Sequence, residues 1–544
     1  MVERGATEKM TLLWLLLISI SPALSINTYD TFLNCLSFYS PNSNISQILY
    51  NQTSISYEAL LNSTIQNLRF TSPTITKPIL ILIPTDEHQI QASVSCCKNQ
   101  SLSMRVRSGG HDYEGLSYRS VNQSMFVMLD LTKLRSIHVH SNQGTAWVQS
   151  GATVGELYYK ISKKNSTLAF PAATCSTVAV GGQFSGGGIG TLMRKYGLSA
   201  DNILDAKIID SNGRILDRAA MGEDLFWAIR GGGGGSFGIV SSWKVRLVQV
   251  PQIVSIFTIN RTLDQGAIDL IYKWQYIAFQ MDPNMFLEAD IRPNINGTEP
   301  GAVFNSLYLG RCTEMLNYMQ VHFPDLGVGK TDCREMSWIQ SAVYFARFGD
   351  ANPKILLDRG LQPKIYNKGT SDYVTDPIPL SAWQGIFDWF RYKGAGSMYM
   401  ISHGGVMSEI LESEIPYPHR ERVLYNIQYL VTWRSGDTDT YLEWIREFRS
   451  NMTCLVSKNP RRAYVNFRDL ELGRNDVGQN ANYENVRVFG EMYFTDNFRS
   501  DDLAVPMMVG RRQKGHSISD ITTMPIPSTV RPAVVGKSPT RMRE

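Results

Sequence analysis

The sequence predicts a protein of two domains that combines helices with strands. Its 544 residues are 43% hydrophobic, and this length allows a buried core but exceeds one compact unit. From Gly109 to Gly238 glycines alternate with strand-forming runs, which indicates a backbone that passes close to something or takes positive φ. After Pro251 glycine becomes rare and aromatic residues become common. We therefore expect a first domain over residues 76–250, with residues 26–75 as its N-terminal part, and a substrate-binding domain over residues 251–465.

Local patterns predict the elements in turn. Residues 77–84 form an apolar run between prolines, typical of a buried strand, and residues 105–107 and 126–131 predict two more strands. In the second domain, alternation over residues 423–430 predicts a strand with one packed face. Residues 441–448 predict a helix laid against that sheet.

Residues 1–25 have the features of a signal peptide. Leu12–Ile20 is apolar and uncharged, and Ala23-Leu24-Ser25 offers small residues for cleavage. The run is shorter than the ~20 apolar residues of a membrane-spanning helix, so we favour secretion over a membrane anchor. The destination would be the cell exterior, the cell wall or the vacuole. A secreted protein can carry N-linked glycans, and acceptor sites occur at Asn44, Asn51, Asn62, Asn99, Asn122, Asn165, Asn260, Asn296 and Asn451.

Charge and cysteine content limit the partners, bonds and metal sites that this protein can have. The net charge of +4 arises from residues 499–544, which hold eight Lys/Arg against four Asp/Glu. The charge-balanced body argues against a nucleic-acid partner. This tail lacks apolar periodicity and is expected to be disordered. Seven cysteines are an odd number, so at least one is free or bonded to something else. No Cys-x-x-Cys pattern occurs, so we expect no metal site. We also expect the protein to be a monomer.

Two short motifs carry the chemistry. Arg107-Ser108-Gly109-Gly110-His111 follows a predicted strand, and adjacent glycines let backbone amides turn inward as an anion site suited to a pyrophosphate. Cys175 lies in a turn of small residues between Phe170 and Gly182. Taken alone, it could equally be a buried thiol or half of a disulfide.

Together with Gly186-Gly187-Gly188 and residues 222–233, these motifs resemble the FAD-binding domain of the berberine bridge enzyme-like oxidases, over about residues 34–498. The resemblance implies an α+β fold of the p-cresol methylhydroxylase/vanillyl-alcohol oxidase type. In that fold two α+β subdomains hold FAD, and a substrate domain has an antiparallel sheet covered by helices. Residues 466–498 would be a truncated C-terminal segment returning to the FAD domain. Cys35 and Cys96 match the family's disulfide, while the pairing of Cys97, Cys312, Cys333 and Cys454 stays open.

The resemblance also implies two covalent bonds to FAD, from His111 to the flavin 8α-methyl group and from Cys175 to C6. Both residue types are nucleophiles suited to an electron-poor ring. Tyr483 matches the catalytic base that takes a substrate proton while hydride goes to flavin N5. Asn426 and Gln428, two apart on one strand, match positions that tune this base. The other residues matched to the cofactor site are Arg107, Ser108, Gly109, Gly110, Tyr113, Val178, Gly182, Gly186, Tyr196, Gly238 and Ile239.

The implied function is a secreted oxidase of a small hydroxylated or amine substrate, such as an alkaloid or a phenolic alcohol. Val178 is a residue type that admits dioxygen in this family, so we expect release of hydrogen peroxide. The alternatives are a carbohydrate oxidase of the same family and a non-catalytic, truncated secreted protein. The chain departs from the family at Ser176, at Gln183 and over residues 499–544. We interpret residues 499–544 as out-of-frame or intron-derived sequence. His403 and His419 are expected at the surface or in loops.

Overall fold

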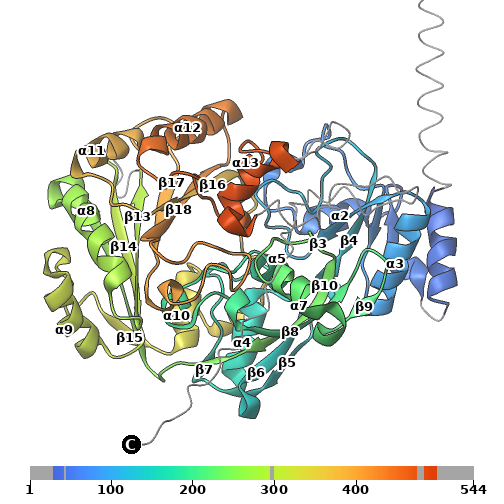
Figure 1. Ribbon diagram of the computed structural model, residues 1–544, viewed down its shortest axis with the longest axis horizontal. Helices are drawn as coiled ribbons and strands as arrows, with labels where there is room; N and C mark the ends of the chain where they lie inside the picture. The colour runs from blue at the N-terminus through green and yellow to red at the C-terminus, as the bar shows by residue number, and fades with distance from the viewer. Residues whose placement is uncertain (1–27, 42–43, 294–298, 475–482, 499–544) are drawn as a thin grey trace, which may run out of the picture.

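Helices and mostly antiparallel sheets make up the structure, which confirms the predicted α+β fold class. The computed structural model describes residues 28–41, 44–293, 299–474 and 483–498. Figure 1 shows two smaller sheets in the blue-to-green N-terminal half and one large sheet in the other half. The predicted signal peptide and tail lie outside the described residues.

The first sheet is built from apolar runs that the sequence marks as strands. Its order is β1 (Leu49–Asn51), β2 (Leu80–Leu82), β4 (Phe126–Asp130) and β3 (Ser103–Arg107), with β4 parallel to both β2 and β3. Helix α3 (Glu87–Asn99) connects β2 to β3 and begins where Asp86 accepts a hydrogen bond from the Gln89 backbone N–H. The Cys35–Cys96 disulfide ties α3 to helical residues 28–39, and it is the pairing that the family resemblance implies.

The second sheet lies beside the first and completes the glycine-rich half. It is antiparallel, with the order β5 (Ile137–His140), β6 (Thr145–Gln149), β10 (Ile239–Arg246), β8 (Ile203–Ile209) and β9 (Ile215–Leu216). Trp243 of the central strand is fully buried among neighbouring apolar side chains. The helices of this half are α2 (Tyr57–Ser63), α4 (Val154–Lys164), α5 (Val180–Ser185), α6 (Met193–Tyr196) and α7 (Arg218–Ile229), and a small pair is formed by β7 (Leu168–Ala169) and β11 (Val248–Gln249).

The third sheet is antiparallel and has seven strands. Their order is β15 (Arg334–Met336), β12 (Val254–Thr262), β14 (Gly301–Tyr308), β13 (Met285–Arg292), β17 (Ser397–Ser402), β18 (Tyr425–Trp433) and β16 (Tyr366–Val374). One face packs on a core of aromatic and aliphatic side chains that includes Trp274, Trp383 and Phe448. Figure 1 shows the helices on that side, which are α8 (Ala267–Ile277), α9 (Cys312–His322), α11 (Leu380–Trp389) and α12 (Thr438–Asn451). The opposite face is turned toward the glycine-rich half.

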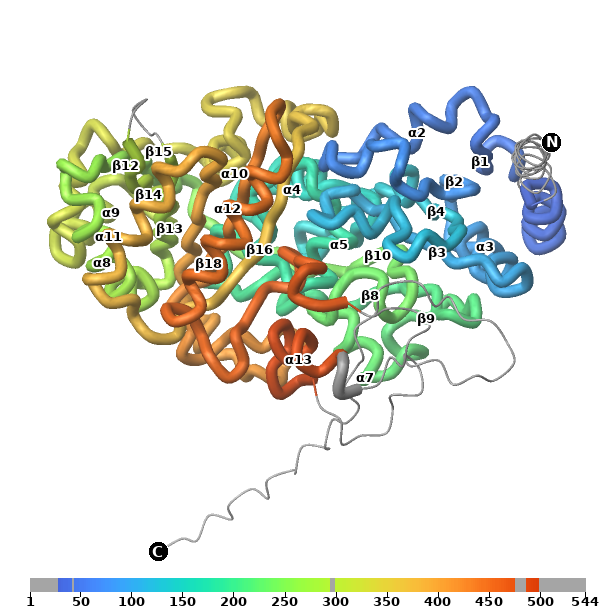
Figure 2. The backbone as a smooth tube through the Cα atoms, turned by 90° about the horizontal axis from the view of Figure 1, so that it is seen from above, coloured from blue at the N-terminus to red at the C-terminus, as the bar shows by residue number. Residues whose placement is uncertain are grey.

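The last described helix, α13 (Tyr483–Phe494), lies at the junction of the two halves in both views (Figure 2). Its side chains Val486 and Phe489 share a buried cluster with Ile189 and Met193 of the glycine-rich half and with Tyr373 of β16. Residues near the C-terminal end of the described chain therefore pack against both the glycine-rich half and the large sheet.

Two histidines lie in loops, which is one of the two placements expected for them. His403 and His419 are nevertheless buried and not at the surface. His403 Nε2 is 3.0 Å from the Tyr417 hydroxyl, and His419 stacks on Tyr373 with ring centroids 3.9 Å apart. The sequence did not indicate their burial, because the groups that surround them come from other segments of the chain.

Two further structural findings concern the cysteines and the membrane. A second disulfide joins Cys312 to Cys333, a pairing that the sequence left open. Within the described residues Cys97, Cys175 and Cys454 form no disulfide. Among the described helices, none combines the length and the apolar character required to cross a bilayer.

Candidate active site

A cavity of about 1190 Å³ lies between the glycine-rich half and the open face of the large sheet. One wall comes from the loop after β3 and from the segment that carries Cys175. The other comes from β12, β13, β14, β17 and β18. Of the predicted site residues, the cavity is lined by Ser108, Gly109, Gly110, His111, Tyr113, Cys175, Val178, Gly182, Gly238, Ile239 and Gln428. The fold thus gathers residues that are more than 300 positions apart in the sequence.

The glycine pair before His111 is needed for close backbone contact. A Cβ on Gly110, whose φ is +71°, would lie 2.0 Å from the Thr64 carbonyl oxygen. A Cβ on Gly109 would lie 2.7 Å from the Ala179 backbone nitrogen. The loop therefore passes between two other segments of the protein while still facing the cavity. Sequence analysis predicted close approach, but the partner of that approach is the protein's own backbone.

His111 and Cys175 are linked through one threonine. Thr177 Oγ1 lies 3.0 Å from His111 Nε2 and 3.6 Å from Cys175 Sγ. Burial lowers the pKa of His111 to about 4, against a smaller opposing effect of its hydrogen bond to Thr177. The imidazole is therefore neutral at physiological pH, and a neutral ring nitrogen has the lone pair that a nucleophile requires.

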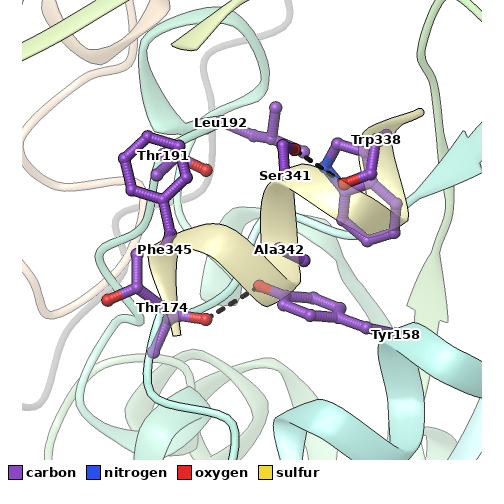
Figure 3. A pocket seen from close by; sticks show the side chains of 9 residues that line it. Tyr158, Thr174, Thr191, Leu192, Trp338, Ser341, Ala342 and Phe345 are labelled. Atoms are coloured by element: carbon purple, nitrogen blue, oxygen red, sulfur yellow. Dashed lines mark hydrogen bonds between the residues drawn. The ribbon is translucent and has the colours of Figure 1, made fainter. Parts of the chain in front are cut away.

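The turn that carries Cys175 is supported from behind. A second cavity of only about 10 Å³ lies there, which is space for about one water molecule (Figure 3). Tyr158 of α4 donates a hydrogen bond to the Ala173 carbonyl at 3.0 Å, and its ring meets Trp338 of α10 (Trp338–Phe345) edge-on. This small cavity is a packing gap, and the helices around it fix the cysteine turn.

Tyr113 occupies the junction of the two walls. Gln428 Nε2 donates to the Tyr113 hydroxyl at 2.5 Å, and the ring of Phe467 lies 6.0 Å away between centroids. Burial, and less strongly the neighbouring Cys175 and Tyr399, raises the pKa of Tyr113. The phenol is therefore protonated at neutral pH and can orient a bound group by hydrogen bonding.

Two residues that were predicted to contact the cofactor, Arg107 and Tyr196, do not line the cavity. The Arg107 guanidinium binds Asp130 and the carbonyls of Leu60 and Leu61, so it braces the loop from inside. The Tyr196 hydroxyl donates a hydrogen bond to the Gln249 carbonyl, away from the cavity.

Gly186 and Asn426 also stand behind the cavity wall. Glycine at position 186 admits Asn466, whose Oδ1 would lie 2.1 Å from an added Cβ. Asn426 is fully buried and donates to the Asp372 carbonyl at 3.1 Å, whereas Gln428 on the same strand reaches the cavity. Alternation along the strand correctly places Asn426 and Gln428 on one face of β18. It could not show that other segments bury Asn426 and leave Gln428 at the cavity.

Tyr483 is the first residue of α13, and its side chain lies outside the described residues. Its role as catalytic base therefore stays a prediction. The tyrosines that the described structure brings to the cavity are Tyr113, Tyr344, Tyr399 and Tyr464.

Sequence analysis missed a polar row across the large sheet. Strand register places Thr258 opposite Asn305, and Asn305 opposite Glu288. Two residues further along β13, Asp290 lies opposite Tyr399 of β17, and Tyr399 lies opposite Gln428 of β18. A signal was available, because Glu288, Asp290 and Arg292 alternate with apolar residues in one strand.

The residues that line the cavity fit FAD in their chemistry. A Cβ on Gly182 would meet nothing within 4 Å, so this glycine leaves cavity space open. The glycine loop offers backbone to a phosphate, and the neutral His111 and the thiol of Cys175 are available to the flavin ring.

Comparison with known proteins agrees with this geometry. Residues 78–218 match a family described as FAD binding domain. Tetrahydroberberine oxidase of Berberis wilsoniae is 47% identical, over 89% of this chain and 92% of that protein. Berberine bridge enzyme-like 26 of Arabidopsis thaliana is 43% identical, over 89% and 93%. The solved structure of Phl p 4, described as a grass pollen allergen with glucose dehydrogenase activity, is 44% identical with a TM-score of 0.82, over 86% of this chain and 94% of that one. The chain therefore belongs to the berberine bridge enzyme-like family of FAD-binding oxidoreductases.

Proposed function

We propose that this protein is an oxidase that holds FAD by two covalent bonds, to His111 and Cys175. The observation that carries the proposal is that both side chains face one cavity and are joined through Thr177. Burial supports a neutral His111 as a nucleophile. Cys175 is kept out of both disulfides, so its thiol is available for a bond to the cofactor.

The proposed reaction removes hydride and a proton from a small hydroxylated or amine substrate, such as a phenolic alcohol or an alkaloid. FAD supplies the hydride acceptor and passes the electrons to dioxygen, giving hydrogen peroxide. Tyr113, held by Gln428, orients the reacting group, and Tyr483 is the proposed base. Val178 lines the cavity and, as a small side chain, leaves room for dioxygen. In Phl p 4 an isoleucine-to-valine variant is described as a glucose oxidase, whereas the wild type is described as a glucose dehydrogenase.

Peptide mass spectrometry tests the attachment. A tryptic digest should show flavin mass on the His111 peptide and on the Cys175 peptide. His111→Ala and Cys175→Ala should each keep one bond, while Cys454→Ala, which removes an exposed thiol, should keep both. Both peptides unmodified in folded protein would refute the assignment, and a purified protein without flavin would instead fit the non-catalytic alternative.

A second candidate is oxidation of carbohydrates. The polar row from Thr258 to Gln428 favours it, because hydroxyl-rich substrates need many donors and acceptors. Peroxide release should be measured with glucose and cellobiose beside coniferyl alcohol and tetrahydroberberine. Reduction of the flavin without peroxide release would identify a dehydrogenase.

We propose that the protein enters the secretory pathway, is glycosylated and is a monomer. Six predicted acceptor sites are exposed, at Asn44, Asn62, Asn99, Asn122, Asn260 and Asn451, and Asn51 and Asn165 are half-buried. Asn296 lies outside the described residues. Two disulfides agree with an oxidising compartment. Expression in a plant secretory system should give a mass that decreases on treatment with an N-glycosidase and a single peak of monomer size on gel filtration.

A further inference from the structure

The polar row has two ends, and only one of them is near the proposed flavin site. Gln428 and Tyr113 form the near end, beside Cys175. Glu288 lies on β13, two strand positions away from Gln428 on β18. Adjacent strands are about 4.8 Å apart, and residues along a strand are about 3.4 Å apart. Because Asp290 is the residue in register with Gln428, Glu288 is displaced by two strand spacings and two residues, which places its backbone about 12 Å from that of Gln428, a span comparable to two sugar rings.

Glu288 is held in place but keeps one side open to the cavity. Asn305 Nδ2 donates to Glu288 Oε1 at 3.0 Å, and Asn305 Oδ1 accepts from Thr258 at 2.8 Å. The Thr258 hydroxyl is in turn 2.7 Å from that of Tyr344. These bonds fix the direction of the Glu288 carboxyl, which lines the cavity with Asn305 and Tyr344.

Between the two ends the cavity is lined by an aromatic ring that has two guanidinium groups over it. Tyr399 lies between β13 and β18, and the guanidinium carbons of Arg292 and Arg347 lie 5.7 and 5.9 Å from its ring centroid. Rings of this kind pack against sugar rings, while guanidinium groups donate hydrogen bonds to hydroxyls.

We propose that Glu288 forms a recognition subsite for the far end of the substrate and that it selects a neutral, polyhydroxylated second ring. The inference rests on the proposed function in its carbohydrate-oxidising form, and it takes the flavin to lie beside His111 and Cys175.

The charges around Glu288 favour a neutral ligand over a cation. Burial, followed by Asp290 on the same strand, raises the pKa of Glu288 to about 8, so the carboxyl carries a proton at neutral pH. The other charged groups that face it are Asp290, Arg292 and Arg347, and Arg292 binds Asp290 directly. Their sum is positive, which disfavours an ammonium group. A protonated carboxyl both donates and accepts, as vicinal hydroxyls require.

Steady-state kinetics with cellobiose and glucose test the subsite. Glu288→Leu should raise KM for cellobiose roughly tenfold, the change expected for one lost hydrogen bond of about 1.4 kcal/mol, with kcat unchanged. KM for glucose should not change, because one ring at the flavin does not reach Glu288. Glu288→Gln should keep the wild-type KM, because an amide also donates and accepts. The KM of the wild type should rise as pH rises through about 8, whereas that of Glu288→Gln should stay flat.

Each contrary outcome has one meaning. An equal rise of KM for glucose, or a loss of flavin in Glu288→Leu, would show a structural role and overturn the inference. A Gln variant as poor as the Leu variant would show that a carboxylate charge is required and would overturn the proposed selection of a neutral ring by a protonated carboxyl. Oxidation of tetrahydroberberine but of neither sugar would overturn the inference and leave the covalent flavin proposal intact, while absence of covalent flavin would overturn the proposed function itself.

Discussion

Lys368 of β16 is the group whose removal should most clearly affect both stability and the site. Its Nζ lies 2.5 Å from Glu114 Oε1 and 2.5 Å from Asp469 Oδ1, and all three side chains are at most 5% exposed. Glu114 follows Tyr113, and Asp469 follows the cavity-lining residue Arg468. One buried ammonium therefore ties two segments that line the cavity, around Tyr113 and Arg468, to β16 of the large sheet.

Replacing this lysine by methionine leaves two buried carboxyls without their cation. Burial acts to lower the pKa of Lys368, but Asp469 and Glu114 together outweigh it and raise the pKa, so the lysine is charged. Breaking a buried pair from one side costs about 3–5 kcal/mol of unfolding free energy. Lys368→Met should lose this amount at pH 7.5.

The pH dependence of the loss gives a further check. Burial already raises the pKa of Glu114, and losing the cation raises it more. A carboxyl with a raised pKa in the folded state lowers stability as pH rises through that value, so the deficit should be greater at pH 8 than at pH 5.

Urea unfolding followed by tryptophan fluorescence measures these differences. Lys77→Met is the matched control, because Lys77 pairs with Glu58 at the surface and should cost no more than about 1 kcal/mol. Adding Glu114→Gln to Lys368→Met should recover part of the loss. The reasoning fails if Lys368→Met costs no more than the control, or if its cost is the same at pH 5 and pH 8.

Three further predictions concern single features. Gly369→Ala places a Cβ 2.8 Å from the Tyr113 ring, so kcat/KM should fall about tenfold or more with covalent flavin retained, and unchanged kinetics would contradict this. Burial lowers the pKa of His403 to about 3, so unfolding free energy should decrease by up to about 1.4 kcal/mol per pH unit below pH 6.5. His403→Gln should flatten that slope in urea titrations from pH 7 to 4.5, and an unaltered slope would argue against it. Removing the disulfide with Cys35→Ser and Cys96→Ser opens a span of 61 residues and should cost about 4 kcal/mol, visible as a lower urea midpoint.

Local patterns in the sequence were sufficient to predict several helices and strands. Strand β2 lies within the residue run that predicted it, and helix α12 contains the predicted run 441–448 and extends beyond it at both ends. These patterns were readable because periodicity and flanking prolines act over a few residues. The motifs around His111 and Cys175 were equally local, and both residues line the cavity.

Tertiary structure decided what those patterns could not. Nothing near His403 in the chain indicates that it is buried, and nothing near Cys312 identifies Cys333 as its partner. Arg107 and Tyr196 stand in cavity-forming segments yet point elsewhere.

The polar row shows the division most clearly. Alternation along β13 puts Glu288, Asp290 and Arg292 on one face, and that much is readable from the sequence. Only strand order places this face beside Gln428, about 140 residues later, and opposite the loop of His111. Sequence by itself determined which residues can act, because side-chain chemistry and backbone period are local. The fold determined which of them act together, because long-range strand pairing alone brings distant segments to one cavity.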